Sequence, residues 1–233
     1  MNLYELAFSC YIYNNFTPFN RTFKDFFSTI DGELNLADKK HRQALIIWLN
    51  KWGCRQFSLE YRDTAADIIE KWYTEVDLDT IPAEKTLWEL NERELKAIAT
   101  IYDSLVDKTA STKARRGRLL RISVGPTGAS KILFALRPEI AAPWDEAIRI
   151  GLGHDGSGAS YLKYLQRIIG DVNTLRISCE KNNVEFAEIP QTIGRSGSTI
   201  VQLIGEYYWM TETRKLPPPA MEVLQHWVKW ADG

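Results

Sequence analysis

Apolar residues recur along most of the chain at the spacing of one face of an α-helix. After Asn20, which can cap a helix, phenylalanines and an isoleucine stand at positions i, i+3, i+4 and i+7. Strict alternation of apolar and polar residues is scarce. The pattern therefore predicts an all-α or nearly all-α protein of about nine to eleven helices. The predicted helical faces are Phe23, Phe26, Phe27 and Ile30; Leu45, Trp48, Leu49 and Trp52; Ala65, Ile68, Ile69, Trp72 and Val76; Leu95, Ile98, Ala99, Tyr102 and Val106; Leu162, Leu165, Ile168 and Ile169; Ile200, Leu203, Ile204, Tyr207 and Tyr208; and Met221, Leu224, Trp227 and Val228.

Local signals mark several helix ends. Asn91, followed three residues later by Glu94, is typical of a capping box, and Gly53 suits the left-handed position after a helix. We expect residues 1–233 to form a single helical domain. Because the composition changes near Asp107, we expect a boundary between two helical lobes there. The N-terminal helices would then lie in 1–107, and a basic hairpin and the C-terminal helices in 108–233.

The composition is that of an ordinary globular protein, with 45% hydrophobic and 25% charged residues in a chain of 233. The three cysteines are far apart and form no CxxC pair, which argues against a disulfide framework or a zinc knuckle and favours a reducing compartment. The chain starts without the order of a signal peptide, and its longest strongly apolar run, Ala44 to Leu49, is too short to span a bilayer. We therefore expect a cytoplasmic protein without a cofactor, a metal or a membrane partner.

The charge distribution is strongly uneven around the middle of the chain. The 31 residues from Lys108 to Pro138 contain no Asp or Glu, although the whole chain has a net charge of -1. Clustered cations attract phosphates, so this stretch predicts duplex DNA or another phosphate-bearing ligand as a partner; the alternative is a solvated face that pairs with acids elsewhere in the fold. We expect Lys113 to Arg121 to be helical, interrupted at Gly117. The candidate phosphate-binding cations are Lys113, Arg115, Arg116, Arg118 and Arg121.

A glycine-punctuated turn, Ser123 to Lys131, lies inside the basic stretch. Backbone N–H groups beside Gly125 and Gly128 could approach a phosphate, and a short buried helix from Ala129 to Leu136 would add the partial positive charge of its N-terminus. The segment also has some likeness to a nucleotide-binding loop. That loop requires a serine or threonine directly after its lysine, where this chain has Ile132, so the spacing argues against an NTPase.

Lys131 is followed by an apolar helix and then by Asp145, in Pro143-Trp144-Asp145-Glu146. From Leu120 to Arg149 this order resembles the helix-hairpin-helix DNA glycosylase superfamily. The resemblance implies that the glycines hold a DNA phosphate, that Lys131 forms a Schiff base and that Asp145, at the start of the next helix, activates the nucleophile. The alternative is that Lys131 is a surface cation and Asp145 a carboxylate favoured by the helix dipole.

Arg195, within a second glycine–serine turn, is a further candidate for a phosphate contact at a helix start; the alternative there is a serine cap with an exposed arginine. The leading hypothesis is thus a DNA-interacting, DNA-repair protein with glycosylase-like base excision. A second hypothesis is a non-enzymatic helical protein that serves protein interaction or oligomerisation. A third is an enzyme that binds a small anionic substrate at the same glycine turn.

Overall fold

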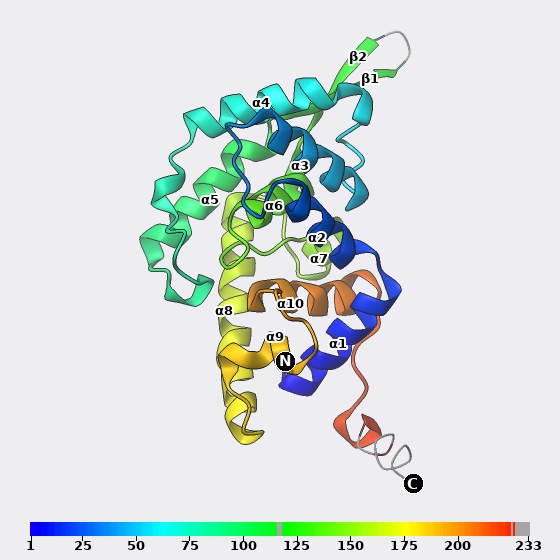
Figure 1. Cartoon of the computed structure of the whole chain (residues 1–233), viewed down its shortest axis with the longest axis vertical. Helices are drawn as coiled ribbons and strands as arrows, with labels where there is room; N and C mark the ends of the chain where they lie inside the picture. The colour runs from blue at the N-terminus through cyan, green and yellow to red at the C-terminus, as the bar shows by residue number, and fades with distance from the viewer. Residues whose placement is uncertain (116–117, 225, 227–233) are drawn as a thin grey trace.

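Helix α8 (Gly158–Lys181) has 24 residues and runs along the long axis of the molecule (Figure 1). The computed structural model describes residues 1–115, 118–224 and 226. In these residues the chain is mostly helical, with ten α-helices and one two-stranded sheet, as the apolar period predicts. None of the described helices has the length and apolar character needed to cross a membrane.

The remaining α-helices are α1 (Leu3–Phe16), α2 (Phe19–Thr29), α3 (Lys39–Lys51), α4 (Arg62–Glu75), α5 (Glu92–Val106), α6 (Gly125–Leu136), α7 (Glu146–Gly151), α9 (Ile189–Thr192) and α10 (Ile200–Tyr208). The strands are β1 (Thr109–Arg115) and β2 (Arg118–Ser123). The short 3-10 turns are η1 (Leu59–Tyr61), η2 (Leu78–Thr80), η3 (Leu87–Glu89) and η4 (Phe186–Glu188), and a π-helical turn, η5 (Trp209–Thr213), follows α10 directly.

Two of the predicted helix-end signals are confirmed, and the cap expected at Asn20 is not. The Asn91 side chain accepts hydrogen bonds from the second and third backbone N–H groups of α5, and Glu94 completes the predicted capping box. Gly53 has a φ of 82°, as predicted, and the next N–H closes the end of α3 by bonding to the Leu49 carbonyl at 2.9 Å. The expected cap at Asn20 is wrong, because α2 already begins at Phe19 and Asn20 lies buried inside it.

The aromatic residues fill the interior, where large rings contribute much buried area. Phe23 of α2 stacks on Phe134 of α6 with ring centroids 4.8 Å apart, and Trp52 stacks on the same Phe134 at 5.8 Å. One buried cluster extends from Leu3 to Tyr208, and α5 packs against both α6 and α8. The core is thus continuous across residue 107, and the lobe boundary expected there stays a prediction.

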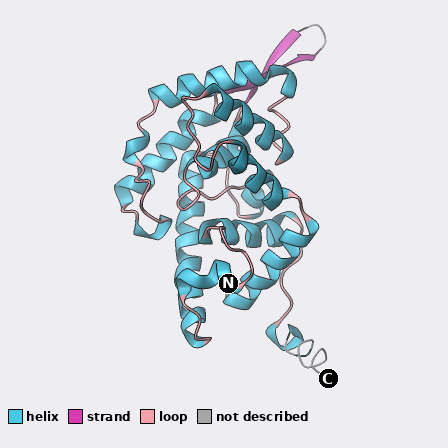
Figure 2. Ribbon diagram, in the orientation of Figure 1, coloured by secondary structure: helices cyan, strands magenta, loops and turns pink. Residues whose placement is uncertain are grey.

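The helix expected from Lys113 to Arg121 is wrong. Strands β1 and β2 pair there as an antiparallel hairpin, with Arg115 opposite Arg118. Two residues, one of them a glycine, separate the strands in the sequence, and this spacing favours a hairpin over an interrupted helix. The hairpin projects beyond the helical body (Figure 2).

The glycine segment therefore does not join two helices. Strand β2 precedes it, and Gly125 is already the first residue of α6, four residues before the predicted start. The predicted end of this helix before Pro138 is confirmed at Leu136. At the C-terminus, Met221 and Leu224 lie in a helical turn, as expected, whereas Trp227 and Val228 lie outside the described residues.

Candidate functional site

A cleft of about 870 Å³ opens between the start of α6, helices α7 and α10, and the loop after α3. Its walls are rich in aromatic rings, and polar groups reach it from several elements. The aromatic rings that line it are those of Tyr13, Phe19, Trp52, Trp144 and Trp209. A concave site with apolar walls and a few convergent polar groups is the usual form of a binding or catalytic site.

Lys131 projects into this cleft from α6 and is buried, with 8% of its surface exposed. Its ammonium group donates a hydrogen bond to the Trp52 carbonyl at 2.6 Å and lies 5.3 Å from the centroid of the Trp52 ring. In the described part of the chain, no carboxylate forms an ion pair with it. Lys131 is therefore no surface cation, and its amine is held by a carbonyl and a ring face.

Asp145 lines the same cleft and is the N-cap of α7. Its Oδ1 atom accepts a hydrogen bond from the Ile148 backbone N–H at 2.8 Å, and its Oδ2 atom accepts one from the Thr213 hydroxyl at 2.8 Å. The carboxylate thus stands at the start of the next helix after Lys131, where the resemblance puts it. The fold brings the two side chains to one cleft, although the second half of α6 and a loop lie between them in the sequence.

The two glycines have different surroundings. Gly125 lines the cleft with a φ of 68°, in the left-handed region that favours glycine. Gly128 is buried, and a Cβ atom there would come within 2.9 Å of the Val124 side chain and 3.1 Å of the Phe57 ring. Only Gly125 therefore stands where a phosphate at the cleft could reach it, and Gly128 serves close packing.

The N-terminus of α6 also lies at the cleft. Its N-cap residue, Val124, has no side chain that can accept a hydrogen bond, and its first turn carries no acid. Uncapped N–H groups and the helix dipole favour an anion at such an end. Lys131 lies about 1.7 turns further along the same helix.

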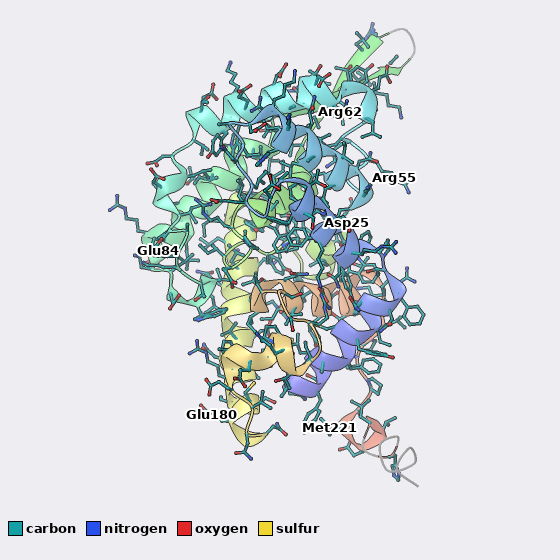
Figure 3. All side chains as sticks on the ribbon, viewed as in Figure 1. Asp25, Arg55, Arg62, Glu84, Glu180 and Met221 are labelled. Atoms are coloured by element: carbon teal, nitrogen blue, oxygen red, sulfur yellow. The ribbon has the colours of Figure 1, made fainter. Side chains whose placement is uncertain are left out.

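The predicted cations that the structure describes lie on the hairpin. Lys113, Arg118 and Arg121 are exposed, Arg115 ends β1, and Arg116 lies outside the described residues. Ser123 and Val124, at the root of the hairpin, line the cleft, so the hairpin rises from the rim of the cleft. Arg62 is the first residue of α4, the helix that packs on β1, and Arg55 is exposed in the loop that borders the cleft (Figure 3).

Arg195 is not placed for the expected phosphate contact. It is buried, and its guanidinium donates two hydrogen bonds to the Glu206 carboxylate, at 2.5 and 2.6 Å. A third bond goes to the Ser198 hydroxyl at 3.2 Å. Its charge is neutralised by a carboxylate eleven residues further along the chain. No local pattern around the glycine–serine turn indicates this pairing.

Comparisons with protein-family models, curated proteins and solved structures gave no match.

Helix α10 presents a polar face to the cleft that sequence reasoning missed. Gln202, Gly205, Glu206 and Trp209 are spaced i, i+3, i+4 and i+7 and all line the cleft. The expected inward residues, such as Leu203 and Ile204, are indeed buried, but on the other side of the helix. The available signal was the pair Gln202 and Glu206, two polar residues four apart in an otherwise apolar helix.

Glu206 is the buried carboxylate of this face. Burial raises the pKa of its carboxyl, against the opposing hydrogen bond and charge of Arg195. Gln202 donates from its amide to the Glu206 carboxylate at 3.2 Å and to the Asn20 side chain at 3.0 Å. Gln202 and Glu206 of this network line the cleft. Among the described residues, no three His, Cys, Asp or Glu side chains gather as a metal site would require.

Proposed function

We propose that this protein binds DNA and that its cleft carries out a glycosylase-like reaction through Lys131 and Asp145. The observation that carries the proposal is the shared cleft: a buried lysine amine with no ion-pair partner in the described residues, and a carboxylate fixed at a helix start. Buried lysines are rare unless they are paired, and a lysine amine in an apolar setting is suited to nucleophilic work.

The reaction would divide between the two side chains. The Lys131 amine, once it has released a proton to solvent, would attack C1′ of a nucleoside, and the bond to the base would break with its electron pair leaving on the base. Asp145 would stabilise the positive charge that develops on the sugar. Its two hydrogen bonds hold it in one orientation, so little reorganisation would be needed at the moment of reaction.

Phosphates would be held around the cleft mouth. The exposed cations Lys113, Arg118 and Arg121 stand on the hairpin that rises from the rim of the cleft. The uncapped start of α6 at Gly125 lines the cleft itself. Neutralising phosphates releases counterions, so we expect affinity for duplex DNA to fall steeply with salt.

Borohydride trapping tests the proposal directly. A duplex that contains an abasic site offers an aldehyde, with which a lysine amine condenses to an imine and releases water. Borohydride reduces the imine to a stable amine, which joins protein and DNA. We expect the wild-type chain to be trapped, and mass spectrometry of the digested product to locate the bond on Lys131.

Matched variants distinguish this reaction from imine formation by other amines of the protein. Lys131→Met keeps the length of the side chain and removes the amine, and we expect it to abolish trapping. Lys24→Met changes an exposed lysine on α2 and should leave trapping unchanged. Trapping that persists in a folded Lys131→Met protein, or a bond located on another amine, would overturn the assignment of Lys131.

A further inference from the structure

The hairpin β1–β2 has exposed cations and exposed leucines on both of its faces. In an antiparallel pair, directly opposed residues share a face, and residues two apart on one strand do too. Lys113 is opposite Leu120, so one face carries Lys113, Leu120 and Arg118. Ala114 is opposite Leu119, so the other face carries Leu119 and Arg121.

The two leucines are unusually exposed. Leu119 has 73% and Leu120 has 42% of its surface accessible. The cations beside them, Lys113, Arg118 and Arg121, make no ion pair within the described residues. Lys108, at the base of the hairpin, differs, because its ammonium lies 3.2 Å from the Glu75 carboxylate. The Arg121 guanidinium donates a hydrogen bond to the Asp107 carbonyl at the base of the hairpin, so the charge that remains available stands on Lys113 and Arg118.

We propose that the hairpin enters the major groove of duplex DNA. A two-stranded ribbon fits this groove, which is about 12 Å wide. On the face with Lys113 and Arg118, the cations can reach phosphates or the N7 and O6 acceptors of guanine, and Leu120 between them can contact a thymine methyl group. The inference rests on the proposed DNA binding and adds the groove and the element that enters it.

The arrangement of the leucines favours this partner over an anionic membrane. A peptide segment that lies in a lipid surface needs its apolar residues on one side. Leu119 and Leu120 are adjacent in one strand, so they point to opposite faces, and each has a cation on its own face. The hairpin thus has no apolar face to bury in lipid, whereas a groove between two phosphate chains meets cations on both sides.

Methylation by dimethyl sulfate distinguishes the grooves in one experiment. The reagent methylates guanine N7 in the major groove and adenine N3 in the minor groove. We expect the full chain, bound at low salt to a mixed-sequence duplex, to protect guanine N7. A variant with Lys113→Thr, Arg118→Thr and Leu120→Thr keeps strand-forming residues, and it should lose this protection and bind about tenfold more weakly or worse.

The control removes two exposed cations elsewhere, with Arg21→Ala and Lys24→Ala on α2, and should keep guanine protection. Binding that protects only adenine N3, or guanine protection that survives in the hairpin variant, would overturn the inference and leave DNA binding standing. Binding to phosphatidylserine vesicles without any protection of DNA would also overturn it. If the wild-type chain binds no duplex at all, the proposed function is overturned as well. Borohydride trapping then tests only whether the Lys131 amine in the cleft reacts with an aldehyde.

Discussion

The Thr213 hydroxyl donates a hydrogen bond to Oδ2 of Asp145 at 2.8 Å. Thr213 is the last residue of the π-helical turn η5, so this bond ties the end of the α10 segment to the start of α7. π-helical turns are rare and often occur at functional sites. Here the turn puts Trp209 at one end in the cleft wall and Thr213 at the other on the carboxylate. One irregular turn thus shapes the cleft and orients its acid.

Replacing Thr213 by valine removes this hydroxyl and keeps the shape of the side chain. We expect the free energy of unfolding to fall by about 1–2 kcal/mol, because the partner is a carboxylate that is partly withdrawn from water. Urea unfolding measures the change, and Thr213→Ser should restore most of it. Thr100→Val on the exposed side of α5 is the control, since Thr100 bonds only to a carbonyl of its own helix. Equal losses at both sites would show that the bond to Asp145 contributes nothing.

The pair Arg195 and Glu206 predicts a much larger effect. Arg195→Met leaves a buried carboxylate without its cation, and we expect a loss of about 3–5 kcal/mol in the free energy of unfolding. Burial already raises the pKa of Glu206, and without Arg195 it would rise further. The folded variant would then keep a proton that the unfolded chain releases above about pH 4, so its stability should fall as the pH rises above that value.

The double variant Arg195→Met/Glu206→Leu provides the control for this pair. It replaces both charges with apolar groups, and we expect it to recover most of the lost stability and to lose the added pH dependence. Urea unfolding at acid and neutral pH measures both effects. A single variant that loses under about 1 kcal/mol, or a double variant as unstable as the single one, would contradict the prediction.

The helical part of the fold was predictable because its signals are local. A 3.6-residue apolar period, the Asn91 box and the Gly53 end act within one or two turns, and the structure confirms them. The hairpin was missed because its strands are short and their residues do not alternate clearly between apolar and polar. Short segments of this kind take their structure from tertiary contacts, here the packing of β1 on α4.

The candidate site was predictable only in part, for the same physical reason. Lys131 and Asp145 stand close in the sequence, on consecutive helices, and they line one cleft. The opposite wall comes from α10, more than fifty residues later, and no spacing rule connects it with α6. Arg195 was misjudged because its partner, Glu206, lies on a helix whose orientation depends on the whole core. The roles of Lys131 and Asp145 stay predictions.

Asp155 predicts a measurable dependence on acid. Hydrogen bonds from the Ser160 hydroxyl and from Ser157 lower the pKa of its carboxyl well below the usual range. The folded state therefore holds the carboxylate more strongly than the unfolded chain does, and the stabilisation is complete above about pH 4 and is lost as the pH falls below that value. Asp155→Asn should make the acid side of the stability curve shallower. Asp25→Asn, at an exposed position on α2 (Figure 3), removes the same charge and should leave the acid side of the stability curve unchanged.

Two glycines in helices should respond in opposite directions to alanine. At Gly170 in α8 a Cβ atom would meet nothing within 4 Å, so Gly170→Ala should raise the free energy of unfolding by about 0.5–1 kcal/mol through the lower entropy of the unfolded chain. At Gly128 the Cβ atom would approach Val124 to 2.9 Å and the Gln56 amide to 3.0 Å, and Gly128→Ala should lower it by about 1–3 kcal/mol. Thermal and urea unfolding of the two variants measure both changes. A Gly128→Ala protein as stable as the wild type would mean that α6 can move away from the loop after α3. Lys131 of α6 donates a hydrogen bond to the Trp52 carbonyl at 2.6 Å, next to that loop. Such a movement would loosen this bond.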